Sequence, residues 1–171
     1  MKRVAVIGSP GAGKTIFSRK LAEKTSLPLV HLDIYYNDEK LGFKEDRAAW
    51  EKLVSELVAK PEWIMDGNYG STFPLRFERA DTIIFLDYKR WRALMGVYKR
   101  RLQYHSKLRP DMPEGWREKT DRNFMRYVWN FNKKSRSIIF AAAEPDHHQK
   151  MIIFRKPKDA ENYLRSLPPK G

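Results

Sequence analysis

Residues 8–15 read Gly8-Ser9-Pro10-Gly11-Ala12-Gly13-Lys14-Thr15, or GSPGAGKT in one-letter code. This run fits the pattern G-x-x-x-x-G-K-[ST] in full, and a chance match in a chain of this length is expected in roughly 0.5% of cases. Glycines let the backbone curl until successive N–H groups point at one anion, and a helix N-terminus adds further N–H groups. The run therefore predicts a phosphate-binding loop. A Gly-rich turn with a surface lysine is the competing interpretation.

The residues on either side of the loop supply the strand and the helix that such a loop needs. Residues 3–7 (RVAVI) are apolar without polar alternation, as in a strand buried on both faces. Residues 14–24 place Ile16, Phe17 and Leu21 at helical spacing. Strands are also predicted at 29–32, 63–65, 82–86 and 151–154, and helices at 46–59, 90–104, 121–143 and 160–167. This alternation predicts one α/β domain over residues 1–171, with helices on both faces of a parallel sheet.

Polar residues follow the predicted strands at the ends where α/β folds bind ligands. Gly8, Asp33, Asp66 and Asp87 each come directly after an apolar run. Asp87 is expected to cap the helix that begins near Arg90. His31 is interpreted as a strand residue rather than a ligand.

The loop predicts a nucleotide site with defined roles for two side chains. Lys14 would reach the β- and γ-phosphates of ATP, and the Thr15 hydroxyl would hold Mg²⁺. The residues expected to bind ATP here are Gly8, Pro10, Gly11, Ala12, Gly13, Lys14, Thr15 and Ile16.

The two long helices of the second half have apolar patterns that predict their buried faces. In helix 90–104 the residues expected to point inward are Trp91, Leu94, Met95, Tyr98 and Leu102. In helix 121–143 they are Phe124, Val128, Phe131, Ile138 and Ala142, while Arg122, Arg126, Lys133 and Arg136 share another side. Residues 105–119 contain Pro110, Pro113 and Gly115 and are expected to form a loop.

The net charge of +13 lies entirely in the second half of the chain. Through Tyr88 there are 13 basic and 13 acidic residues, whereas residues 89–136 alone hold 15 basic and 4 acidic ones. Such a region favours an anionic partner, either nucleotide phosphates or nucleic acid, although a solvated basic face has the same composition.

Composition excludes several other classes of protein. With no cysteine, the chain has no disulfide scaffold, thiolate metal site or cysteine nucleophile. The apolar run near the N-terminus is too short for a signal sequence or a membrane span, so we expect a cytoplasmic protein. A membrane surface is not expected as a partner, because no exposed apolar face accompanies the basic stripe.

At the loop and again near Asp66, the chain resembles the adenylate-kinase-like branch of P-loop phosphotransferases, and within it the bacterial topology-modulation protein (FlaR-like) family. The segments that carry the resemblance are GSPGAGKT at 8–15, HLD at 31–33, WIMDGNY at 63–69, ERADTIIFLD at 78–87, RPDMPEGW at 109–116 and VWNF at 128–131. The resemblance implies a three-layer fold with a five-stranded parallel sheet in the order 2-3-1-4-5. It also implies an acceptor-binding region at about 34–62 and a helical lid at about 105–136.

The resemblance also assigns roles to residues on the acceptor side. Asp66 lies where related kinases place a carboxylate near Mg²⁺ and the acceptor, and Asp33 where they orient an acceptor or a metal-bound water. Asn68 belongs to the same acceptor-binding turn. A turn-forming Asp before Gly and a plain strand-end carboxylate are the competing interpretations of Asp66 and Asp33.

Several basic residues are assigned to the triphosphate by the same resemblance. Arg109 and Arg136 lie where lid arginines clamp the transferring phosphoryl group, which makes them candidate catalytic residues beside Lys14. Arg100 and Arg101 correspond to lid-base arginines that bind ATP. Lys156, followed by Pro157, resembles the segment that borders adenine.

The chain departs from the family after the Asp66 turn. Members often have Asn-Tyr-Ser-Arg-Thr where this chain has Asn68-Tyr69-Gly70-Ser71-Thr72. An arginine that would bind an acceptor phosphate is therefore missing at Ser71, and Arg76 could replace it.

Two functions remain open from the sequence. The first is a phosphotransferase that uses ATP and Mg²⁺ on a small acceptor, for which a nucleoside monophosphate is one candidate. The second is an ATP-binding regulatory protein that contacts DNA through its basic half, where Trp91, Tyr98 and Trp129 are interleaved with cations. Either could be a monomer or a homodimer.

Overall fold

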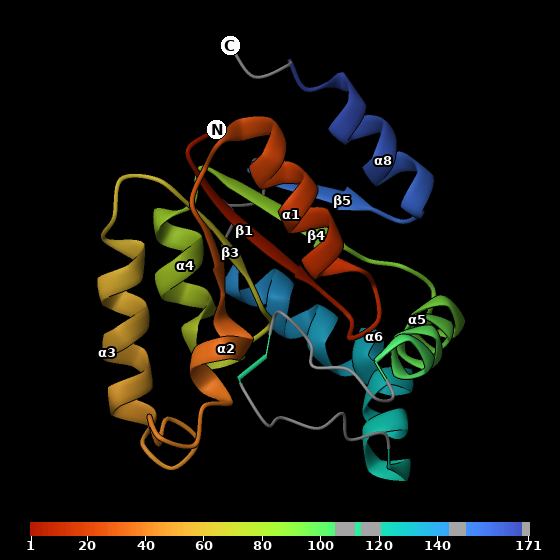
Figure 1. Ribbon diagram of the computed structural model, residues 1–171, viewed down its shortest axis with the longest axis horizontal. Helices are drawn as coiled ribbons and strands as arrows, with labels where there is room; N and C mark the ends of the chain where they lie inside the picture. Colours follow the sequence, from red (N-terminus) through yellow and green to blue (C-terminus); the bar gives the residue numbers. More distant parts are fainter. Residues whose placement is uncertain (105–111, 114–120, 144–149, 169–171) are drawn as a thin grey trace.

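The computed structural model describes residues 1–104, 112–113, 121–143 and 150–168 (Figure 1). Five parallel strands form one sheet in the order β2-β3-β1-β4-β5, which confirms the predicted order. Their bounds are β1 Arg3–Gly8, β2 Leu29–His31, β3 Trp63–Asp66, β4 Thr82–Leu86 and β5 Met151–Phe154. The loop 8–15 therefore leaves the central strand.

Helices cover both faces of this sheet (Figure 1). Their bounds are α1 Lys14–Thr25, α2 Leu32–Tyr36, α3 Arg47–Val58, α4 Phe73–Arg79, α5 Arg90–Gln103, α6 Arg122–Ala142 and α8 Pro157–Ser166, with a 3₁₀ turn, η1, at Gly70–Thr72. The short helices α2 and α4 were not predicted from the sequence. Neither has the length over which an apolar period becomes visible.

The alternation of side chains along β1 separates two cores. Val4 and Val6 face α1 and α8, where they pack with Phe17 and Leu164. Ala5 and Ile7 face the opposite side, where α3, α4 and α6 supply an aromatic-rich core. Because both faces are covered, the strands are continuous apolar runs, as expected of a parallel sheet.

Helix α5 does not bury the face that its apolar pattern predicted. Trp91, Met95, Tyr98 and Leu102 are 49%, 50%, 62% and 63% exposed, so the prediction that they point inward was wrong. The buried side carries small residues, Ala93 and Val97, which pack with Val128 of α6. In α6 the pattern was wrong only at Ile138, which is 54% exposed while Ile139 is buried.

No helix among the described residues is both long and apolar enough to cross a membrane.

Candidate functional site

The loop between β1 and α1 has the backbone of an anion cradle. Gly11 and Gly13 have φ angles of 80° and 83°, which side chains other than glycine rarely adopt. Nζ of Lys14 donates to the carbonyl oxygens of Gly8 and Ser9 at 2.9 and 3.3 Å, so the ammonium lies over its own loop. Among the described residues no side chain caps α1. A helix end of this kind can bind a phosphate in place of a cap.

The loop also packs directly on α5, a contact that sequence reasoning missed. A Cβ placed on Gly96 would lie 2.0 Å from the carbonyl oxygen of Gly11, and one on Gly11 would lie 2.2 Å from that of Ala93. The two backbones can touch only because both positions are glycine. A glycine inside a predicted helix was the available signal.

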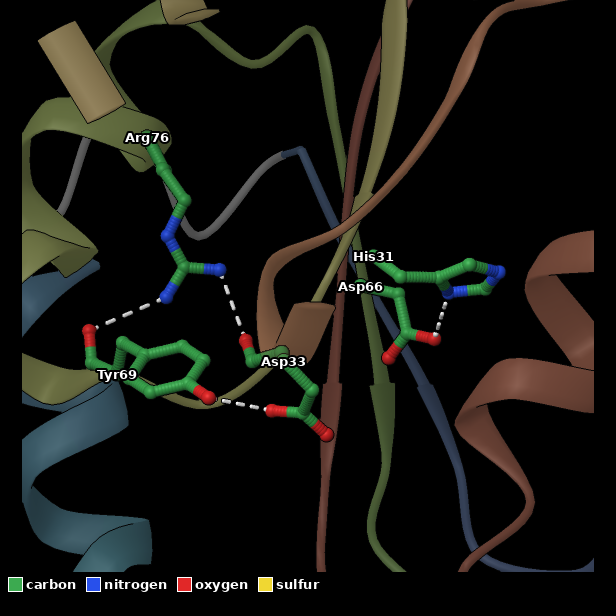
Figure 2. A network of polar contacts seen from close by, with 6 residues as sticks. His31, Asp33, Asp66, Tyr69 and Arg76 are labelled. Atoms are coloured by element: carbon green, nitrogen blue, oxygen red, sulfur yellow. Dashed lines mark hydrogen bonds and ion pairs between the residues drawn. The ribbon is translucent and has the colours of Figure 1, made fainter. Parts of the chain in front are cut away.

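On the other side of the loop, Asp66 ends β3 and is 5% exposed. Its Oδ2 lies 3.0 Å from Nδ1 of His31, the neighbouring residue in the register of β2 and β3 (Figure 2). With the carboxylate ionised, this hydrogen bond requires the proton on Nδ1. His31 therefore orients Asp66, a contact that its interpretation as a plain strand residue did not include.

Asp33 lies in the first turn of α2, two residues after β2 ends at His31, and not at the strand end itself. The hydroxyl of Tyr69 donates to its Oδ1 at 2.5 Å (Figure 2). Burial, and secondarily the charge of Asp33, raises the pKa of Tyr69, so the phenol keeps its proton. Tyr69 in turn packs against Tyr36 and Trp50, with ring centroids 4.6 and 5.0 Å away. The aromatic cluster therefore fixes the direction of this carboxylate.

Arg76 is a correction to the predicted acceptor site. Its side chain is completely buried, and its guanidinium donates to the carbonyl oxygens of Gly67, Asn68 and Tyr69 at 2.8, 3.1 and 3.2 Å. Figure 2 shows the bond to Tyr69. Burial lowers its pKa to about 10. With no exposed surface, Arg76 cannot replace the missing arginine at Ser71 as a phosphate ligand. It holds the Asp66 turn in shape instead.

Asn68 joins this turn to the glycine-rich loop. Its Oδ1 accepts a hydrogen bond from the backbone N–H of Gly8 at 3.1 Å. Asn68, which was predicted to bind the acceptor, therefore also fixes the position of the glycine-rich loop.

A cavity of about 760 Å³ lies between the glycine-rich loop, the Asp66 turn, α2 and α6. We call it the acceptor cavity. Its polar lining includes Lys14, Asp33, Asn37, Lys44, Asn68, Arg100 and Ser135, and its aromatic lining includes Tyr36, Tyr69, Phe73, Phe124, Tyr127 and Phe131. Flat rings dominate its walls, and Asp33 is the only carboxylate among the described residues that line it.

A second cavity, of about 550 Å³, lies on the opposite side of the same loop. We call it the nucleotide cavity. Its lining includes Gly11, Ala12 and Gly13 of the loop, Ile16 and Lys20 of α1, Trp91, Arg92, Met95, Gly96 and Lys99 of α5, and Pro157, Ala160 and Glu161 of α8. The glycine-rich loop thus borders both cavities, with Pro10 and Lys14 lining the acceptor cavity and Gly11, Ala12 and Gly13 lining the nucleotide cavity.

The three basic residues of the second half that were expected to bind ATP, Arg100, Arg101 and Lys156, are not among the described residues that line the nucleotide cavity. Arg100 lines the acceptor cavity, whereas Arg101 is exposed and is absent from the described lining of both cavities. Lys156 is the exposed residue preceding α8, and its neighbour Pro157 borders the nucleotide cavity in its place. Lys99 on that wall was not predicted.

Arg136 contacts a carboxylate at the end of β4. Its Nε lies 3.6 Å from Oδ2 of Asp87, and its side chain is 44% exposed. The prediction that Asp87 caps α5 was wrong, because Lys89 precedes that helix and no described side chain caps it. Arg109, the other predicted clamp, lies outside the described residues, as does most of the loop 105–119.

The donor set fits a magnesium ion held partly by phosphate. Among the described residues there is no cluster of three or more His, Cys, Asp or Glu side chains that could hold a metal alone. Mg²⁺ in phosphate sites usually has only one or two protein oxygens, with phosphates and waters completing its shell. Thr15 in the first turn of α1 and Asp66, which pairs in register with Val6 of β1, belong to adjacent elements and match this chemistry.

Solved structures with the same fold are kinases of small molecules. A shikimate kinase from Acinetobacter baumannii matches at 16% identity with a TM-score of 0.62, covering 96% of this chain and 92% of its own. A gluconokinase from Sinorhizobium meliloti 1021 matches at 13% identity with a TM-score of 0.54, and the match covers 96% of this chain and 87% of the gluconokinase. A deoxyadenosine kinase from M. mycoides matches at 12% identity with a TM-score of 0.52, and the match covers 95% of this chain and 94% of the deoxyadenosine kinase.

The chain has the fold of P-loop kinases. The similarity extends over nearly the whole length of each chain, while the low identities establish the fold alone. No protein-family model and no curated protein matches the sequence.

Proposed function

We propose that this P-loop protein transfers the γ-phosphoryl group of ATP to a small acceptor, either to a hydroxyl group or, in a nucleoside monophosphate, to a phosphate oxygen. The observation that carries the proposal is the arrangement of two cavities that both border the glycine-rich loop, with Lys14 on the wall of the acceptor cavity. A donor on one side and an acceptor on the other would face each other across the γ-phosphate, as in-line transfer requires.

The residues have separable roles in this reaction. Lys14 and the N-terminus of α1 bind the β- and γ-phosphates. The roles of Arg136 and Arg109 as clamps for the transferring group rest on the resemblance of the sequence to related kinases. Thr15 and Asp66 would hold Mg²⁺, which supplies charge neutralisation on the phosphates when bound. Asp33, aimed by Tyr69, orients the acceptor hydroxyl and takes its proton as the new bond to phosphorus forms and the bond to the ADP oxygen breaks.

The walls of the acceptor cavity favour an acceptor with a flat ring. Six aromatic side chains line it, and stacking on such walls favours a nucleobase or a similar ring system. If the acceptor carries a phosphate of its own, as a nucleoside monophosphate does, Lys44 and Arg100 line this cavity beside Lys14 among the described residues and could contact that phosphate. We place the protein in the topology-modulation (FlaR-like) branch of the adenylate-kinase-like proteins on the motifs described above.

The test is ATP consumption with a panel of acceptors. The panel contains nucleosides, nucleoside monophosphates, shikimate and gluconate, and one class is expected to stimulate ADP formation. Lys14→Ala is expected to lower the rate about a thousandfold, because it removes a positive charge that stabilises the transferring group. Lys52→Ala, at an exposed position on α3 away from both cavities, is the control. ATP binding without transfer to any acceptor would contradict the proposal.

DNA binding is the second candidate, and one groove favours it. A cavity of about 390 Å³ on the surface is lined by Lys89, Arg90, Trp91, Trp129, Asn132 and Lys133. The guanidinium of Arg90 lies 4.5 Å from the Trp129 ring centre, a combination of cation and ring that suits a nucleic-acid strand. Binding to a random duplex should then fall steeply with salt and weaken in Lys133→Glu.

A further inference from the structure

Helix α5 carries an apolar stripe on its outer face. Trp91, Met95, Tyr98 and Leu102 are each about half exposed or more. Their spacing of four, three and four residues puts them on one line, about 16 Å long at 1.5 Å per residue. The buried residues Ala93 and Val97 lie on the opposite side of the helix. We call these four side chains the α5 stripe.

The nucleotide cavity accounts for only half of the α5 stripe. Trp91 and Met95 line that cavity, but Tyr98 and Leu102 are outside its described lining. These last two are also the most exposed of the four, at 62% and 63%. Their exposure therefore requires another explanation.

Basic residues flank the α5 stripe on both sides. Residues 89–104 contain six Lys or Arg and no Asp or Glu. At 100° per residue, Arg92 and Lys99 fall on one side of the stripe and Arg90 and Arg101 on the other. All four are exposed. An apolar line between two basic margins is typical of helices that lie in a membrane interface.

We propose that the outer face of α5 docks on an anionic membrane surface. Tyr98 and Leu102 would enter the headgroup region, while Arg90 and Arg101, which lie outside the described lining of the nucleotide cavity, would contact acidic lipids. The expectation from sequence that no exposed apolar face exists was wrong, because it assumed that this stripe is buried.

Charge and side-chain type argue against two other occupants. A second copy docked through the same face would bring two sets of four flanking cations together without acidic partners on that helix, which is unfavourable. A nucleic-acid strand would use the cations and the rings, but Met95 and Leu102 offer no surface on which a base stacks well.

The experiment is cosedimentation of the full chain with phosphatidylcholine vesicles, with and without phosphatidylglycerol. Binding is expected only to the vesicles with phosphatidylglycerol, and high salt should weaken it. The double variant Tyr98→Gln with Leu102→Gln should bind at least about tenfold more weakly. Leu41→Gln, at a residue 46% exposed elsewhere, is the matched control and should bind normally.

Charge is tested separately. Arg90→Glu with Arg101→Glu should abolish binding, whereas Lys60→Glu with Arg165→Glu makes the same change in net charge on other surfaces and should bind more strongly than the first pair. Nucleotide binding and circular dichroism of the Tyr98/Leu102 variant should match the parent, which separates this test from that of the proposed kinase activity.

Three results would overturn the proposal. The first is undiminished vesicle binding by the Tyr98/Leu102 variant. The second is a dimer in sedimentation velocity that this variant dissociates, which would assign the face to a second copy. The third is binding of a single-stranded oligonucleotide, lost in this variant, without binding to acidic vesicles.

Discussion

The two sides of the glycine-rich loop are held by different forces. On the side of the Asp66 turn, hydrogen bonds hold the backbone. The N–H group of Gly8 donates to Asn68, and the guanidinium of Arg76 donates to three carbonyl groups. On the side of α5, two glycine backbones touch, and no side chain could fit between them. The first side tolerates small shifts as long as donors and acceptors stay paired, whereas the second has no spare volume.

The largest expected effect is on the hydrogen-bonded side. Arg76→Leu should lower the free energy of unfolding by about 3 kcal/mol, because three buried carbonyl groups lose their donor. Urea denaturation would measure it. Arg79→Leu on the same helix is exposed and should change stability by less than about 0.5 kcal/mol. Equal effects in the two variants would show that the buried guanidinium is not what holds the turn.

On the packed side, Gly96→Ala should destabilise by about 2 kcal/mol and weaken ATP binding, because the new methyl group forces α5 away from the loop. Gly42→Ala is the control, since its Cβ would meet open space although its φ is 64°. Backbone strain in Gly42→Ala should lower the free energy of unfolding by about 1 kcal/mol, and ATP binding should be unchanged. Calorimetry with ATP would distinguish the two, and normal ATP binding by Gly96→Ala would mean that the close contact has no part in shaping the site.

Tyr69→Phe removes a single hydrogen bond on the side of the Asp66 turn, the one from the Tyr69 hydroxyl to Asp33. The variant should lose about 1.5 kcal/mol of stability, because the Asp33 carboxylate loses its phenolic donor. With the active acceptor, kcat should fall while the KM for ATP stays constant, since the donor chamber is untouched. Tyr163→Phe, on α8, should leave kcat unchanged. A rise in the KM for ATP alone would contradict the role given to Tyr69.

The smallest effect is expected at the opposite end of the sheet. Oδ2 of Asp81 accepts hydrogen bonds from the backbone N–H groups of Lys2 and Arg3 at 2.8 and 2.9 Å. Partial burial raises the pKa of Asp81, but these bonds outweigh it and the net pKa is lowered. A lowered carboxyl pKa gives stability that is present at neutral pH and lost as the pH falls through its folded value.

Asp81→Asn should therefore destabilise by about 1 kcal/mol at pH 7 and by less at pH 3. Denaturation at the two pH values would measure this, and transfer activity should not change. A loss of activity would show that hydrogen bonds far from the loop also shape the site.

The glycine-rich loop and the Asp66 turn could be predicted from the sequence because each depends on residues close together in the chain. The glycine-rich loop requires a strand before it and a helix after it, and Asp66-Gly67 marks a turn at a strand end. Each of these depends on neighbours in sequence. The positions of Asp33 and Asp66 near one another then followed from the parallel sheet, whose strand ends lie at one edge.

Arg76 and α5 were misread because their partners are distant in sequence or are backbone. An arginine near a site is expected to bind an anion, yet Arg76 binds three carbonyl groups. In α5 the apolar stripe was expected to be buried, but the helix approaches the loop through Ala93, Gly96 and Val97. An apolar period shows which residues share a face, not whether that face meets the core.

The sequence by itself determined the class of fold and the conformation of the glycine-rich loop between β1 and α1, because glycine conformations act over a few residues. Only the tertiary structure decided which cations face each chamber, which arginine is buried and which face of α5 meets solvent. Those outcomes depend on side-chain contacts between elements far apart in the chain, where packing and desolvation outweigh local pattern.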